Sequence, residues 1–91
     1  MTYKIFEHKK AKKFFKKNKK NKKLLLLINK KYMEILKNPF DSSYKELNSI
    51  KCPKCHRARV GNFRIIFYIS EEKEYIEIID IIPRKDNYKL F

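Results

Sequence analysis

Several residue types are scarce in this chain of 91 residues. It has one glycine, three prolines and no tryptophan, which excludes a collagen-like chain, a glycine-rich linker and a phosphate-cradling P-loop. The uncharged apolar run Leu24 to Ile28 is far shorter than the roughly 18 residues that a membrane-spanning helix needs. It is also too short and too far from Met1 for a signal peptide. The sequence therefore predicts a cytoplasmic protein with no membrane partner.

Acidic residues are also few, with 10 Asp and Glu against 24 Lys and Arg, for a formal net charge of +14. Hydrophobic residues still make up 43% of the chain, which is enough for one compact core and argues against intrinsic disorder. Most of the positive charge lies in the N-terminal half. Such a field attracts nucleic acid, an anionic membrane or an acidic protein, and a solvated lysine surface fits it equally well.

Arginine is used selectively in this lysine-rich chain. Only four of the 24 basic residues are arginines, and all four follow residue 56: Arg57, Arg59, Arg64 and Arg84. The guanidinium group has a planar fork of donors that can grip a phosphate with two hydrogen bonds at once. This placement favours an anion-binding site in the C-terminal half.

Hydrophobic periodicity predicts an α+β fold in a single domain over residues 1–91. It indicates a strand over residues 2–7, an antiparallel helical hairpin over 8–18 and 22–37, an irregular stretch over 38–56, and then a mostly antiparallel sheet with strands at 57–60, 63–69 and 74–82. Asn38-Pro39 ends the second helix, because a residue before proline avoids the helical conformation. Leu26, Leu27 and Met33 lie outside the apolar stripe of that helix, which indicates either deeper burial or a docking surface.

Gly61-Asn62 is a two-residue hairpin loop of the type II′ pattern. Its register pairs Arg59 with Arg64, and places Arg57 on the same face as both. Like charges directly opposite each other destabilise a strand pair, so a fold that keeps such a pair is expected to bind an anion there. The alternative is that the arginines splay outward or pair with acidic side chains. The other face is predicted to be core, with Ala58, Val60, Phe63, Ile65 and Phe67.

The segment 57–67, RARVGNFRIIF, followed by Arg84-Lys85-Asp86-Asn87-Tyr88, resembles the RelE/ParE superfamily of toxins from type II toxin-antitoxin modules. The order and spacing of the elements along the whole chain resemble that superfamily too. The resemblance implies a RelE-like, microbial-RNase-like sheet packed on a helical hairpin.

Members similar to RelE are mRNA interferases, endoribonucleases that cleave mRNA in the ribosomal A site by attack of a ribose 2′-hydroxyl, without a metal or cofactor. By this resemblance Arg57 and Arg59 match the basic residues of the second sheet strand, Arg64 the phosphate-stabilising arginine, Arg84 the arginine that acts on the leaving group, and Tyr88 the tyrosine that stacks on or orients a base. The implied partners are an acidic RelB-like antitoxin, the ribosome and mRNA, with translation inhibition as the outcome. The alternatives are a ParE-like, non-nuclease toxin that inhibits DNA gyrase, and a non-catalytic RNA-binding module.

Cys52-Pro53-Lys54-Cys55-His56 has the spacing of a haem-attachment motif or of half a zinc site. Haem attachment would require export, and a zinc site would require the distant His8 as a fourth ligand. We therefore expect a loop cysteine pair and no metal. His56 directly precedes the arginine strand, so it is also a candidate accessory base.

Overall fold

The computed structural model describes residues 3–47 and 54–83. Its elements, in chain order, are β1 (Lys4–Glu7), α1 (Lys9–Lys17), α2 (Lys22–Lys37), β2 (Lys45–Leu47), β3 (Cys55–Val60), β4 (Phe63–Ser70) and β5 (Tyr75–Pro83). The predicted α+β class, helical hairpin and mostly antiparallel sheet are confirmed, and the predicted element boundaries lie within about two residues of the observed ones.

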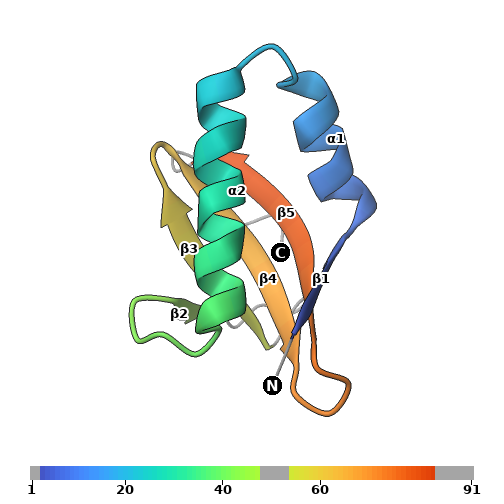
Figure 1. Cartoon of the computed structure of the whole chain (residues 1–91), viewed down its shortest axis with the longest axis vertical. Coiled ribbons are helices and arrows are strands. Elements are labelled where there is room, and N and C mark those ends of the chain that lie inside the picture. The colour runs from blue at the N-terminus through green and yellow to red at the C-terminus, as the bar shows by residue number, and fades with distance from the viewer. Residues whose placement is uncertain (1–2, 48–53, 84–91) are drawn as a thin grey trace.

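The sheet has five strands in the order β1-β5-β4-β3-β2. Neighbouring strands are antiparallel except for β1 and β5, which run parallel and are separated in the chain by the two helices and the strands β2, β3 and β4. The two helices run in opposite directions across one face of this sheet (Figure 1). The other face is left without a helix in the described part of the chain.

Each helix begins at a side chain that caps its first turn. The Nδ1 atom of His8 accepts a hydrogen bond from the Lys10 backbone N–H, and Oδ1 of Asn21 accepts one from the Leu24 backbone N–H, both at 3.3 Å. These bonds satisfy N–H groups that have no partner within the helix. The second helix ends at Asn38, directly before Pro39, as the sequence predicts.

The main core lies between the helices and the sheet. The second helix contributes Leu24, Ile28, Tyr32 and Ile35, and these pack on strand residues that include Ala58, Ile65, Phe67, Ile76 and Ile78. Burying side chains of this size stabilises the fold by about 1.5–3 kcal/mol each. A smaller cluster of Cys55, Ile66 and Ile82 lies on the other face of the sheet. The face assignments predicted for the hairpin are therefore correct.

A β-bulge in β5 keeps its apolar side chains in the main core. Opposite the consecutive residues Ile66 and Phe67 stand Asp80 and Ile78, so Ile79 is the extra residue. In a regular strand Ile78 and Ile81 would point to opposite faces, because they are three residues apart and strand side chains alternate. With the bulge, both pack in the helix-side core, and Ile79 packs against the smaller cluster.

One part of the sequence prediction is wrong: residues 38–56 are not wholly irregular. The short strand β2 pairs with the beginning of β3, which starts at Cys55 rather than Arg57. Three residues are too few to show an alternating pattern, so this edge strand depends on pairing with its neighbour rather than on local sequence.

None of the helices in the described part combines the length and apolar character needed to cross a lipid bilayer.

Candidate functional site

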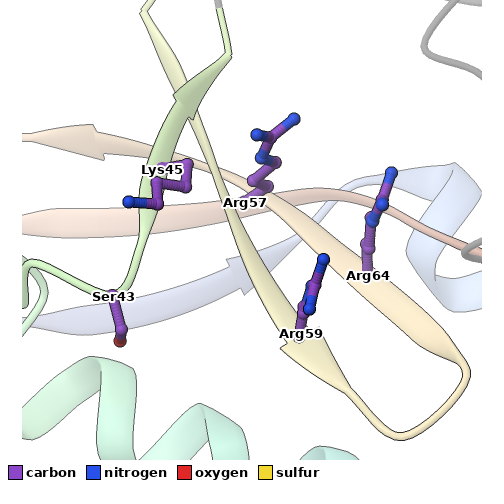
Figure 2. Close-up of a pocket in the computed structure, with 5 residues that line it drawn as sticks. All are labelled: Ser43, Lys45, Arg57, Arg59 and Arg64. Atoms are coloured by element: carbon purple, nitrogen blue, oxygen red, sulfur yellow. The ribbon is translucent and has the colours of Figure 1, made fainter.

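A hollow of about 370 Å³ opens on the face of the sheet that the helices leave bare. It is lined by Ser43, Lys45, Arg57, Arg59 and Arg64. The three arginine side chains rise from β3 and β4 on the same side of the sheet, and Lys45 stands on β2 next to them (Figure 2). We call this set of five residues the arginine hollow.

Strand register builds the arginine hollow. Arg59 stands directly opposite Arg64, and Lys45 directly opposite Arg57. Residues directly opposite each other in an antiparallel pair share a face, and residues two apart along one strand share it too. Two cross-strand pairs, offset by two residues on β3, therefore bring all four cations together.

The loop that sets this register is as predicted. Gly61 has a φ of +55°, whereas Asn62 does not have a positive φ, which agrees with a type II′ loop. Val60 then faces Phe63 across the first pair after the loop. The prediction that Arg59 and Arg64 share a face opposite Ala58 and Ile65 is confirmed.

The electrostatics of the arginine hollow are of one sign. Its described lining has four cationic side chains and no carboxylate, and neither Glu77 nor Asp80 lines it. Arg59 is exposed, whereas Arg57 and Arg64 are half-buried. Partial burial places these donors where water screens a bound anion less than it would in bulk solvent. The arrangement favours an anion with several oxygen acceptors, such as a phosphate.

Sequence reasoning missed two residues of this lining, Ser43 and Lys45. Both lie in the segment expected to be irregular, and the only sequence signal is a Lys two residues after Ser43 in a stretch with turn-forming residues. The turn is held by Asp41, whose Oδ1 accepts hydrogen bonds from the Ser43 backbone N–H at 2.9 Å and from its hydroxyl at 2.7 Å. These bonds, the backbone one first, hold the pKa of Asp41 below its ordinary value. The ordered turn delivers Lys45 to the start of β2.

His56 does not join the arginine hollow, so its assignment as an accessory base is wrong. Its ring stacks on Phe67 at 5.7 Å between centroids, on the helix side of the sheet. Cys55, its neighbour on the strand, packs with Ile66 and Ile82 on the other side. Because the two side chains point to opposite faces, they cannot bind one metal ion together. His8 is engaged as the cap of α1.

Arg57, Arg59 and Arg64 are thus brought together, as predicted. Arg84, Tyr88 and Cys52 lie outside the described residues. Chemically, the arginine hollow can hold an anion and stabilise negative charge that grows on it. Among the lining residues that the structure describes, the four cationic side chains are all donors, and only the Ser43 hydroxyl adds an acceptor.

Comparison with known proteins identifies the fold and the family of the chain. The fold is similar to that of toxins in three solved structures. One is the toxin-antitoxin complex RelBE2 from Mycobacterium tuberculosis, at a TM-score of 0.73 and 18% identity over 92% of this chain and 100% of the other. Another is a double arginine-to-alanine mutant of the Escherichia coli toxin RelE in the free state, at 0.74 and 20% over 93% and 86%. The third is the archaeal RelE-RelB complex from Pyrococcus horikoshii, at 0.62 and 24% over 96% and 100%.

The chain is thus a small α+β protein with a fold similar to that of RelE toxins. The profile of ParE toxins of type II toxin-antitoxin systems (parDE) matches residues 5–88, and the chain belongs to that family, within the RelE/ParE superfamily. No curated protein matches the sequence.

Proposed function

We propose that this toxin is a ribosome-dependent endoribonuclease that cleaves mRNA in the ribosomal A site. The observation that carries the proposal is the arginine hollow, where Arg57, Arg59 and Arg64 converge on the face that no described helix covers. A purely structural role would not favour four like charges gathered in one hollow, because like charges repel each other. The proposal places the single toxin domain in the cytoplasm with the ribosomes.

The proposed reaction is attack of a ribose 2′-hydroxyl on the adjacent phosphorus. The 2′-oxygen forms a bond to phosphorus and passes its proton to solvent, and the bond from phosphorus to the 5′-oxygen breaks as that oxygen takes up a proton from solvent. The products are a 2′,3′-cyclic phosphate and a 5′-hydroxyl. Negative charge on the phosphate oxygens is greatest at the five-coordinate stage, so cations aimed at those oxygens lower the barrier.

Each proposed catalytic residue has a role in that reaction. Arg57 and Arg59, two residues apart on one strand, would align the phosphate, while Arg64 on the next strand would stabilise the charge at the five-coordinate stage. Arg84 is proposed to act on the leaving group by donating a hydrogen bond to the 5′-oxygen as negative charge grows on it, and Tyr88 to stack on or orient a base. Lys45, directly opposite Arg57, extends the cationic surface along the RNA backbone.

The proposed partner is an acidic antitoxin of the RelB type. Two of the structures with a similar fold are complexes of a toxin with its antitoxin. A partner with negative charge would also complement a chain whose net charge is +14.

The test is a comparison of purified protein with and without ribosomes. We expect discrete cleavage of a translated mRNA when ribosomes are supplied, little cleavage of the same free mRNA, and 5′-hydroxyl ends on the fragments. Binding of RNA without cleavage under any of these conditions would instead assign a non-catalytic RNA-binding module.

The matching family profile supports a second candidate, because it describes ParE toxins. On that alternative the protein inhibits DNA gyrase and has no nuclease activity. A supercoiling assay with purified gyrase, run beside the ribosome assay, separates the two. Inhibition of supercoiling with intact mRNA would replace the first proposal with the second.

A further inference from the structure

The outward surface of α2 carries large apolar side chains. The helix faces the sheet with Leu24, Ile28 and Ile35, which are buried. Leu26 is 71% exposed and Met33, two helical turns further on, is 68% exposed. Leu27, on the flank of the same surface, is 51% exposed. We call these three residues the outer ridge.

The outer ridge is left largely uncovered by the described part of the chain. Three of the five large hydrophobic residues that the structure leaves exposed belong to it, so the sequence alternative of deeper burial is wrong. Single exposed hydrophobics are ordinary on a protein surface. Three on one helix, with two of them in line along its outer side, mark a surface for a partner.

The charges beside the outer ridge indicate the chemistry of that partner. Lys22, Lys23, Lys30 and Lys37 are all exposed on the same helix. The one acidic residue of α2, Glu34, is already engaged by Lys31 at 3.3 Å. An apolar line flanked by lysines complements a helix with an apolar line flanked by carboxylates. A second copy of this chain is a poor match, because it would set lysines against lysines in a protein with a net charge of +14.

We propose that the outer ridge is the docking site for an acidic amphipathic helix of a partner protein. The identification of this partner as the antitoxin rests on the proposed function. The argument from the apolar and charged side chains of α2 does not depend on it. The main core joins α2 to the helix side of the sheet, and the arginine hollow opens on the other side. A helix held only on the outer ridge would therefore leave the arginine hollow open, so docking and catalysis should be separable by mutation.

The experiment uses a synthetic helical peptide with leucine at alternating three- and four-residue spacing and glutamate at most other positions. A scrambled isomer has the same composition and charge but no apolar stripe. Binding to the full chain is measured by calorimetry. We expect the amphipathic peptide to bind at least about tenfold more tightly than its isomer, since only it can bury the outer ridge.

The informative variant is the double substitution Leu26→Gln and Met33→Gln. Glutamine has nearly the helix propensity of the residues it replaces and adds no charge, so the helix and its electrostatics are retained. We expect peptide binding to weaken by about tenfold or more, with ribosome-dependent cleavage unchanged. The matched control is Asn29→Gln, which changes an exposed side chain of the same helix without removing apolar surface or altering charge, and which should leave binding unchanged.

Several outcomes would overturn the docking proposal. Equal binding of the two peptides, no binding, or full binding by the double variant would show that the outer ridge is not the site. A dimer of the wild-type chain that the double variant loses would assign the surface to self-association. Binding to phosphatidylserine–phosphatidylcholine vesicles that the double variant loses, with no peptide binding, would assign it to a membrane surface. Failure of mRNA cleavage alone would contradict only the proposed function, because the peptide assay does not depend on it.

Discussion

At the scale of single residues, Arg64 is the most direct test of catalysis. Arg64→Ala is expected to lower the rate of ribosome-dependent mRNA cleavage by about 10²–10³, since it removes a cation aimed at the five-coordinate phosphate. Arg84→Ala should act in the same direction through the leaving group. The matched control is Lys73→Ala in the turn before β5, which removes one charge outside the arginine hollow and should leave the rate unchanged.

Arg64→Ala is also expected to change the stability of the fold only slightly. Arg64 stands directly opposite Arg59, so its removal relieves the repulsion of a like-charge pair, while it also removes the favourable contacts of the side chain and alanine weakens the strand slightly. We therefore expect the free energy of unfolding to stay within about 0.5 kcal/mol of the wild-type value. Full cleavage activity in the folded variant would contradict the site assignment.

Tyr32 is a second residue with a specific role, because it links α2 to the end of β1. Its hydroxyl donates a hydrogen bond to Oε2 of Glu7 at 3.1 Å, and its ring is nearly buried. Burial, and then the charge and hydrogen bond of Glu7, raise the pKa of Tyr32 above its ordinary value of 10.0. Tyr32→Phe is expected to lower the free energy of unfolding by about 1 kcal/mol at neutral pH.

The raised pKa of Tyr32 also predicts a pH dependence. The unfolded chain loses this proton near its ordinary pKa of 10.0, whereas the folded chain retains it, so stability from Tyr32 is full below pH 10 and is lost as the pH rises further. The loss is about 1.4 kcal/mol per pH unit. Urea unfolding of wild type and Tyr32→Phe across this range isolates the effect, because lysine titration is common to both. Parallel curves above pH 10 would contradict it.

At the scale of elements, the β3–β4 hairpin depends on one backbone conformation. Gly61 has a φ of +55°, and a Cβ atom added there would meet nothing within 4 Å. The cost of Gly61→Ala is therefore backbone strain alone, about 1–2 kcal/mol. Gly61→Asn should cost clearly less, since asparagine, unlike alanine, is common at the positive-φ positions of such hairpin turns. Equal unfolding free energies for the two variants, measured in urea, would contradict this account of the loop.

The elements also show how far local sequence carries the fold. The hairpin, its faces and the pairing of Arg59 with Arg64 could be predicted, because a two-residue loop and strict alternation leave no other parity. Lys45 could not be placed, because β2 is a strand only through its pairing with β3. The bulge at Ile79 could not be predicted either, because it follows from the packing of both Ile78 and Ile81 in the main core.

At the scale of the whole molecule, positive charge is distributed over both sides of the sheet. Six of the nine residues of α1 are lysines, while Lys45 and three arginines line the hollow on the other side. The lysines of α1 should attract RNA non-specifically, and the arginine hollow should bind it specifically. The two should therefore contribute separately to the salt dependence of the affinity for RNA.

Salt titration of RNA binding measures that separation. For a short single-stranded RNA followed by anisotropy, the logarithm of the affinity should fall linearly with the logarithm of salt concentration, by about 0.7 for each phosphate contact. Lys45→Ala and Arg57→Ala should each reduce the slope by about that amount. Lys73→Ala, a change of equal charge outside the hollow, should leave it unchanged. Identical slopes for all three variants would show that the arginine hollow makes no phosphate contact.

The sequence by itself determined the class of fold, its two helices and four of its five strands, and the shared face of Arg57, Arg59 and Arg64. Those features follow from local periodicity, from Asn38-Pro39 at the end of the second helix and from a loop that permits one register. Tertiary structure alone decided that Lys45 completes the cationic surface, that His56 turns away from it to stack on Phe67, and that Leu26 and Met33 stay exposed. Each depends on what packs against an element from elsewhere in the chain, and a helix or strand pattern does not contain that information.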